Sequence, residues 1–269
     1  MMSPSAVNVE ISSSCNKSCS CCGRRKRERE NPDADMNYGY MDMGMVHSVA
    51  GQLLHGTVVQ LHNNGEPLMY PELGEAISCF NHCITGLNTN AKLINDKAHE
   101  IGSLNSITIS IIPNDPEGND QLMAVQAWLE SKCRKPKLIV LRFLGSVIEI
   151  EQYSSWLMLA KEYGLILAYR QLHAPEGSFD YDNDPVIPEM GICQEALFKL
   201  SIDRHGNVSP CVRYDPCGDH RIGNLYMSNI AQIWIGKKRR EFLEHHLAGR
   251  RDLASPICAK CDYWGICRG

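Results

Sequence analysis

Eight residues near the N-terminus, Cys15-Asn-Lys-Ser-Cys19-Ser-Cys21-Cys22, contain four of the chain's 13 cysteines. Cys15, Cys19 and Cys22 follow the spacing Cys-x3-Cys-x2-Cys, which places three thiolates on one short loop. Three thiolates can bind three irons of a cubane 4Fe–4S cluster and leave the fourth iron open to a ligand. A zinc site and a ferredoxin cluster are the alternatives, but zinc favours Cys-x2-Cys pairs and a ferredoxin needs a fourth ligand nearby.

Short apolar runs alternate with helical patterns through the first two-thirds of the chain. The expected strands are Val7–Ile11, Thr57–Leu61, Ile84–Leu87, Ile107–Ile112, Leu138–Leu144 and Leu165–Tyr169. The expected helices are Met41–Leu54, Pro71–Phe80, Lys97–Leu104, Leu122–Leu129 and Tyr153–Tyr163. This alternation predicts an α/β fold with a parallel sheet covered by helices. Because six units are too few for a closed eight-stranded barrel, we expect an open, partial (β/α)6 barrel with ligands at the carboxyl ends of its strands.

The pattern changes in the last third of the chain. Ala174–Pro188 is rich in Pro, Gly, Asp and Asn and predicts a linker or lid. Phe198–Asp203 and Val208–Pro210 flank Gly206, which would supply a positive φ in the turn of a β-hairpin. A single helix is expected over Ile230–Leu247. We therefore expect two domains, residues 1–173 and residues 174–269.

The cysteine loop after the first predicted strand resembles that of the radical S-adenosylmethionine (SAM) superfamily. The resemblance implies that the open iron binds the amino and carboxylate groups of SAM. It also implies that an electron from the cluster cleaves SAM to methionine and a 5′-deoxyadenosyl radical, which removes a hydrogen atom from a substrate. The family usually has an aromatic residue before the third cysteine, whereas this chain has Cys21. The spacing favours Cys22 as the ligand and a packing role for Cys21.

Asn63-Asn64-Gly65-Glu66-Pro67 follows the second predicted strand and resembles the family's Gly-Gly-Glu-Pro motif. A backbone carbonyl and the Glu66 carboxylate can accept hydrogen bonds from the ammonium group of SAM. The resemblance therefore implies that Gly65 and Glu66 contact SAM.

Three further polar residues lie on or after predicted strands. Asn90 is in Thr89-Asn90-Ala91, where the family often has Thr-Asn-Gly. Ser110 and Arg142 lie at strand positions where relatives bind the ribose and the methionine carboxylate. A buried strand has little reason to carry an arginine without an anionic partner. A salt bridge within the sheet would also explain Arg142, and a satisfied core hydroxyl would explain Ser110.

A second group of cysteines lies in the C-terminal third and resembles the SPASM/twitch extension of the superfamily. The twitch form binds one auxiliary 4Fe–4S cluster through two hairpin cysteines and a Cys-x2-Cys pair. The implied ligands are Cys193, Cys211, Cys258 and Cys261. The pattern of a full SPASM domain, with two auxiliary clusters, is not finished before Gly269. A structural zinc ribbon with the same four cysteines is the alternative.

The resemblance runs from Val7 to Cys267, and the cysteine layout is similar to that of the deoxy-scyllo-inosamine dehydrogenase of aminoglycoside biosynthesis. It implies that Arg170 binds the substrate at the end of the sixth strand, with His173 as a second candidate. An ordinary loop ion pair would also explain both residues. Cys217 and Cys267 are most simply structural, although Cys217 could return a hydrogen atom to a substrate radical.

The resemblance favours oxidation of a small polar molecule, with the auxiliary cluster as electron acceptor. Radical epimerisation of a sugar or aminoglycoside, with Cys217 as hydrogen donor, is the first alternative. Modification of a ribosomal peptide is the second, although only 14 residues precede Cys15 and the peptide-recognition domain of many maturases does not fit there. A non-enzymatic redox or zinc scaffold would leave the Gly65-Glu66-Pro67 match unexplained.

Composition narrows the class of protein further. The formal net charge of -4 gives no reason to expect nucleic-acid binding. No apolar run approaches the roughly 18 residues of a membrane span, and Met1–Ile11 lacks the pattern of a secretory signal. Clustered cysteines in such a chain are more often metal ligands than disulfides. We expect a cytoplasmic enzyme that takes electrons from a donor such as flavodoxin or ferredoxin.

Overall fold

The computed structural model describes residues 3–33, 36–112, 115–144, 153–170, 191–213, 215, 218–259 and 261. Three candidate residues of the sequence analysis, His173, Cys217 and Cys267, lie outside the described residues, as does the linker predicted at 174–188.

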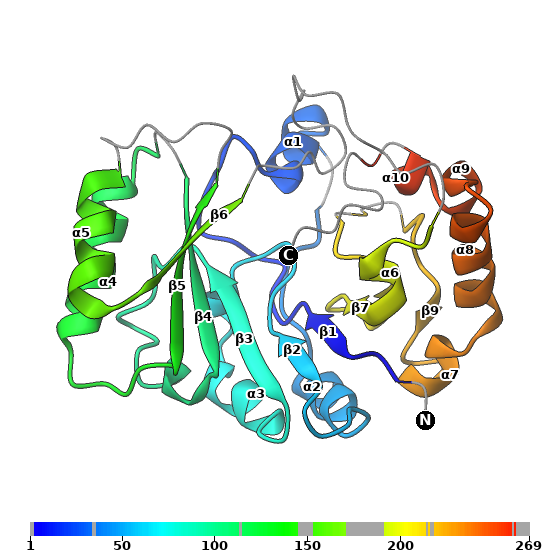
Figure 1. The fold of residues 1–269 in the computed structure, drawn as a ribbon, viewed down its shortest axis with the longest axis horizontal. Helices are drawn as coiled ribbons and strands as arrows, with labels where there is room; N and C mark the ends of the chain where they lie inside the picture. Colours follow the sequence, from blue (N-terminus) through cyan, green and yellow to red (C-terminus); the bar gives the residue numbers. More distant parts are fainter. Residues whose placement is uncertain are drawn as a thin grey trace.

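A nine-stranded sheet forms the centre of the described structure, with the strand order β6-β5-β4-β3-β2-β1-β7-β8-β9 (Figure 1). Its parallel part consists of β1 (Ala6–Val9), β2 (Val58–Gln60), β3 (Ile84–Thr89), β4 (Ser106–Ile111), β5 (Leu138–Leu144) and β6 (Ile166–Arg170). Each of these strands pairs with the next one along the chain. The predicted α/β fold with a parallel sheet is therefore confirmed.

Helices cover the sheet between successive strands. They are α2 (Met43–Ala50), α3 (Leu73–Cys79), α4 (Gly118–Glu130) and α5 (Ser154–Tyr163), with the 3₁₀ helices η1 (Pro67–Met69) and η2 (Ile101–Ser103). The core lies between the two layers, where Ile107 and Ile109 of β4 join one apolar cluster with Val125 and Trp128 of α4. Burial of these large apolar side chains is the main force that holds the helices on the sheet.

Two helix predictions were wrong. Lys97–Leu104 forms turns and η2, because backbone bonds such as Leu104 N to Ile101 O span three residues rather than four. Ile230–Leu247 forms two helices, α7 (Ile230–Trp234) and α8 (Lys237–Leu247). The break occurs at Gly236, whose extended backbone (φ −67°, ψ 159°) precedes α8.

The C-terminal region extends the same sheet. Strand β7 (Lys199–Ile202) pairs in parallel with β1, and β8 (Asn207–Ser209) and β9 (Gly223–Asn224) follow in antiparallel order. Gly206 has φ +74° in the turn, which confirms the predicted hairpin. Helices α6 (Gln194–Phe198), α9 (Arg251–Ala254) and α10 (Pro256–Ala259) complete this region beside α8.

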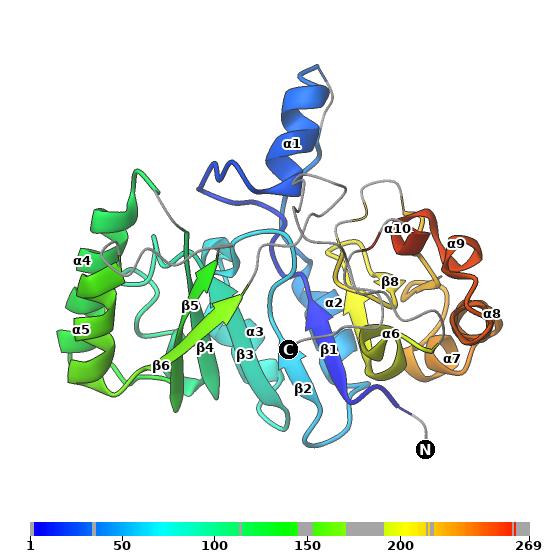
Figure 2. The ribbon, with the colours of Figure 1, turned by 45° about the horizontal axis from the view of Figure 1, so that its top comes forward.

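Helix α1 (Gly23–Glu30) was not expected from the sequence, and neither were the short helices α6, α9 and α10. Helix α1 begins directly after Cys22 and stands above the carboxyl ends of the parallel strands (Figure 2). It therefore places the cysteine loop at the edge of the sheet where ligands of parallel sheets bind. Across the described residues, no helix combines the length and apolar character that crossing a membrane requires.

Candidate functional site

The N-terminal cysteine loop connects β1 to α1. Cys15, Cys19, Cys21 and Cys22 are half-buried there, and the Cys22 N–H donates to the Cys19 carbonyl at 3.2 Å. Burial, together with negative charge on Cys21, Cys15 and Cys22, raises the pKa of Cys19 to about 12. The thiols thus lie close enough to disfavour one another's ionisation. They can become thiolates together when a cation such as iron binds.

Basic side chains hold this loop in shape. The Arg25 guanidinium donates to the carbonyl of Cys15 at 3.2 Å and to that of Lys17 at 2.8 Å. It also pairs with Glu28 at 2.6 Å. Lys17 forms an ion pair with Asp115 in which both side chains are 7 % exposed. Breaking a buried pair leaves an uncompensated charge, so this pair fixes the cysteine loop against the segment after β4.

The Gly65-Glu66 segment packs directly against the start of the cysteine loop. The Glu66 N–H donates to the Ser14 carbonyl at 2.7 Å. A Cβ atom at residue 65 would collide with the Ser12 carbonyl oxygen and stand 2.7 Å from the carbonyl carbon of Ser13. Only glycine permits this close approach of two backbones.

The Glu66 carboxylate binds the chain itself. It is buried and accepts hydrogen bonds from Leu68 N at 3.0 Å, Thr89 Oγ1 at 2.6 Å and Asn90 N at 2.8 Å. Burial raises the pKa of Glu66, and these three donors oppose the rise because they stabilise the ionised form. In this structure Glu66 therefore ties the motif to the end of β3.

Asn90 links the end of β3 to the cysteine loop. Its amide donates to Asn16 Oδ1 at 2.9 Å and lies 3.8 Å from Cys15 Sγ. The next residue, Ala91, has φ +60°, the left-handed conformation that glycine adopts readily. This geometry explains why Thr-Asn-Gly is the usual sequence at such a turn.

Basic side chains gather near the ends of β2, β5 and β6. Arg142 pairs in register with Ser110 of β4, and burial together with the charge of Arg170 lowers the pKa of Arg142. No described carboxylate forms an ion pair with either arginine, and Arg170 Nε is buried without a partner in the described part of the chain. These groups can bind an anion that is not part of the described chain.

His62 belongs to the same group and was not foreseen from the sequence. Burial, together with the charges of Arg142 and Arg170, lowers the pKa of His62 to about 3. Its Nδ1 accepts the N–H of Asn88 at 3.1 Å, so the neutral ring carries its proton on Nε2. The sequence feature that could have pointed to His62 is its position directly before the Asn63–Pro67 motif.

The four C-terminal cysteines predicted as ligands line one cavity. These residues are Cys193, Cys211, Cys258 and Cys261. Burial raises the pKa of Cys258, and negative charge on Cys211, Cys261 or Cys193 would raise it further. The donor set fits a 4Fe–4S cluster, which takes one thiolate on each iron. Among the described residues, no three Cys, His, Asp or Glu side chains converge as ligands of a single metal ion.

Two histidines and an arginine complete this cavity. His220 is 2 % exposed, and neither of its ring nitrogens has a hydrogen-bond partner among the described residues. His246 accepts the N–H of Cys193 through Nδ1 at 3.3 Å. Arg213 Nη2 lies 3.2 Å from Cys261 Sγ. None of these three neighbours was expected from the sequence.

Comparison with known proteins identifies this C-terminal region. Residues 193–262 match the family model of SPASM, an iron–sulfur cluster-binding domain. No curated protein sequence matches the chain.

Solved structures share the fold of the whole chain. BtrN in complex with AdoMet and 2-DOIA has a TM-score of 0.59 and 19% sequence identity over 96% of this chain and 92% of BtrN. Streptococcus suis SuiB bound to S-adenosylmethionine has a TM-score of 0.67 and 13% identity over 99% of this chain and 72% of SuiB. SuiB bound to precursor peptide SuiA has a TM-score of 0.63, also at 13% identity. The chain resembles the radical SAM enzymes of the SPASM/twitch group.

The SPASM match includes the four cysteines that line the C-terminal cavity. The structure brings the N-terminal cysteines together with Gly65, Glu66 and Asn90, and it places Arg142 beside Ser110 and near Arg170. The choice between Cys21 and Cys22 as the third ligand stays a prediction. The roles of these residues in binding SAM and substrate also stay predictions. Cys217 lies outside the described residues.

Proposed function

We propose that this protein is a radical SAM enzyme that oxidises a small polar molecule. Cys15, Cys19 and Cys22 would hold a 4Fe–4S cluster with an open iron, and Cys193, Cys211, Cys258 and Cys261 an auxiliary cluster. When bound, the first cluster supplies the electron that cleaves SAM to a hydrogen-abstracting radical, and the second offers an acceptor for an electron from the substrate. The observation that carries the proposal is that the fold contains two separate groups of cysteines, one on the loop between β1 and α1 and one lining the C-terminal cavity.

Residues beside the first site would bind and orient SAM. Gly65 lets the motif loop lie against Ser12 and Ser13. A backbone carbonyl of this loop would accept a hydrogen bond from the SAM ammonium. Arg142 has no ion pair with a described carboxylate and would bind the SAM carboxylate. Arg170, with its buried Nε lacking a partner in the described structure, would hold the substrate.

The decisive experiment is anoxic reconstitution followed by incubation with SAM and dithionite. Formation of 5′-deoxyadenosine is the expected result, and its absence from protein with full iron content would overturn the proposal. Mass spectrometry of the product then distinguishes the reactions. Oxidation removes two hydrogens, whereas epimerisation leaves the mass unchanged. A peptide substrate, such as the one in the SuiB structure, would show the change on the peptide.

A further inference from the structure

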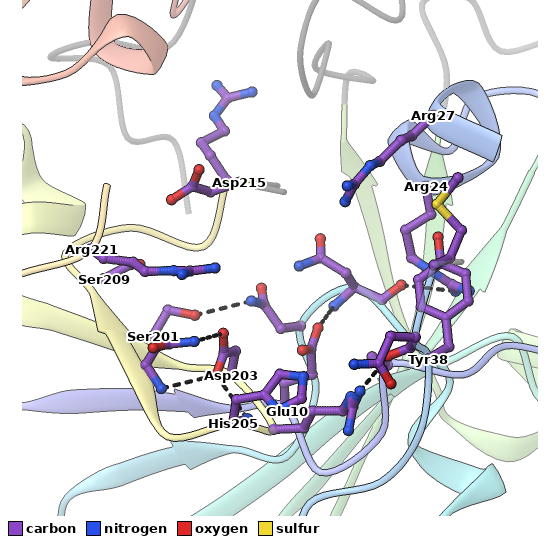
Figure 3. Close-up of a pocket in the computed structure, with 18 of the residues that line it drawn as sticks. Glu10, Arg24, Arg27, Tyr38, Ser201, Asp203, His205, Ser209, Asp215 and Arg221 are labelled. Carbon is purple, nitrogen blue, oxygen red and sulfur yellow. Dashed lines mark hydrogen bonds between the residues drawn. The ribbon is translucent and has the colours of Figure 1, made fainter. Parts of the chain in front are cut away.

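A polar cavity of about 290 Å³ lies between α1 and the β7–β8 hairpin. Figure 3 shows Arg24 and Arg27 of α1 on one side, Ser201, Ser209 and Arg221 on the other, and Glu10 at the base. The volume is at the lower end of the roughly 300–1,000 Å³ typical of ligand pockets. The cavity therefore suits one small molecule.

The cavity adjoins both cysteine sites. Asn63 and Asn64 line it and directly precede Gly65, which packs on the cysteine loop. Ser13, two residues before Cys15, also lines it. On the opposite side, Cys211 lines both this cavity and the cavity of the C-terminal cysteines. A molecule bound here would lie next to both.

The acidic residues of the cavity are already engaged. Asp203 accepts from His205 N at 2.8 Å and from Asn207 N at 2.9 Å. Asp215 accepts from three backbone N–H groups, those of residues 218 to 220, at 2.7 to 2.8 Å. Glu10 accepts from Asn64 N at 3.1 Å, and burial raises the pKa of Glu10 to about 7. These hydrogen bonds fix the carboxylates but leave their charge, and the five described arginines that line the cavity outnumber its three described acidic residues.

The arginines of the cavity are engaged to different degrees. Arg24 is stacked 4.0 Å over the Tyr38 ring, donates to the Asn64 carbonyl at 3.3 Å and lies 3.9 Å from the Glu28 carboxylate. Arg27 and Arg221 form no ion pair with a carboxylate in the described part of the chain. Their side chains extend into the space above Glu10 from opposite walls (Figure 3). Two guanidinium groups facing one small space favour an anion between them.

We propose that this cavity binds the anionic end of the substrate, and that the substrate is a small hydroxylated molecule bearing a carboxylate or phosphate group. Arg170 does not line the cavity, so its proposed contact is with the reacting end of the same molecule. Arg27 and Arg221 donate to the anionic oxygens. Glu10, Ser209 and Asn207 offer partners to the hydroxyl groups. The assignment of the ligand as substrate rests on the proposed function, whereas the anion preference rests on the cavity alone.

Isothermal titration of the reconstituted protein tests the anion preference with four probes on one scaffold: glucose 6-phosphate, glucuronate, glucose and glucosamine. We expect at least one of the two anions to bind about tenfold or more tightly than glucose and glucosamine, as a charge-assisted pair requires. The doubly substituted Arg27→Gln/Arg221→Gln protein should lose this difference. Arg29→Gln should retain it, because Arg29 is exposed on α1 and does not line the cavity.

Equal binding of all four probes, no binding of either anion, tighter binding of glucosamine, or an unaltered preference in the double variant would each overturn the proposal. The affinities of glucose 6-phosphate and glucuronate show whether the cavity prefers a phosphate or a carboxylate. Iron content and circular dichroism report whether the double variant is folded. If the anion binds but wild-type protein does not cleave SAM, the proposed function fails while the cavity assignment stands.

Discussion

The two cysteine sites of this molecule have opposite surroundings. Charged side chains surround the N-terminal loop: Arg25 binds its carbonyls, and Lys17 within it pairs with Asp115. The C-terminal cavity is lined instead by neutral groups such as His220 and Phe242, with Arg213 as its one described cation. Net charge, hydrogen bonds to sulfur and exposure set the potential of an iron–sulfur cluster. Different surroundings therefore favour different redox tasks.

The sites also differ in the number of thiols that their spacing offers. The N-terminal loop supplies Cys-x3-Cys-x2-Cys, which leaves one iron of a cubane without a protein ligand. The C-terminal cavity contains four cysteines from separate segments, enough for every iron. This contrast is the basis for the proposed division, with substrate chemistry at the first site and electron transfer at the second. Substitutions that affect one site alone can separate these tasks.

The largest effect is expected from the triple substitution Cys15→Ala, Cys19→Ala and Cys22→Ala. SAM cleavage should fall to background, and iron should fall from about eight to about four per chain, the content of two and then one cubane clusters. Iron and sulfide analysis with chromatography of 5′-deoxyadenosine measures both. Cys133→Ala is the matched control, because Cys133 belongs to neither site. Continued formation of 5′-deoxyadenosine by the triple variant would show that the radical site lies elsewhere.

The double substitution Cys258→Ala and Cys261→Ala should separate cleavage from turnover. Iron should again fall to about four per chain, yet SAM cleavage without substrate should persist, because the N-terminal loop is untouched. Oxidised product should be lost. If wild-type protein holds only about four irons together with zinc, the C-terminal cavity is a structural zinc site and the oxidation hypothesis loses its electron acceptor.

Replacing Gly65 by alanine tests the close packing on the first site. The new Cβ would collide with Ser12, so the motif loop must move away from the cysteine loop. We expect SAM cleavage to fall about tenfold or more and the free energy of unfolding to fall by about 1–3 kcal/mol. Gly118→Ala is the control, since its Cβ would meet only the Asp115 Cβ at 3.9 Å. Normal cleavage by the Gly65 variant would show that this contact does not position SAM.

The substitution His220→Phe tests whether the His220 ring influences the reduction potential of the proposed C-terminal cluster. The His220 ring is buried beside the four cysteines, and an N–H directed at a cluster sulfur would raise the cluster potential. Loss of a hydrogen bond worth about 1 kcal/mol lowers a one-electron potential by about 40 mV. An anoxic redox titration followed by electron paramagnetic resonance measures the shift, with His245→Phe on α8 as control. An unchanged potential would mean that the imidazole does not contact the cluster.

The sequence predicted local features better than long-range ones. Strands β1 to β6 were all found because each is a short apolar run, and the hairpin of β7 and β8 because Gly206 permits a positive φ. The cysteine spacing also grouped the four C-terminal cysteines that line one cavity, while their role as cluster ligands stays a prediction. The ion pair of Lys17 with Asp115 and the gathering of His62 with Arg142 depend instead on which loops meet above the sheet. Helix α1 was missed because its sequence is charged throughout and has no apolar stripe.

The smallest effect is expected at the turn beside the first site. Ala91 has φ +60°, which costs a residue with a Cβ about 1–2 kcal/mol. Glycine removes that strain but makes the unfolded chain more flexible, at a cost of about 0.4–1 kcal/mol. The substitution Ala91→Gly should therefore stabilise the protein by about 0.5 kcal/mol and leave SAM cleavage unchanged. Urea unfolding of the reconstituted protein measures it, with Ala76→Gly in α3 as a control that should destabilise, because glycine is disfavoured within a helix. If both substitutions lowered the free energy of unfolding equally, the turn at Ala91 would carry no strain. Alanine at this position would then not destabilise the turn beside the first site.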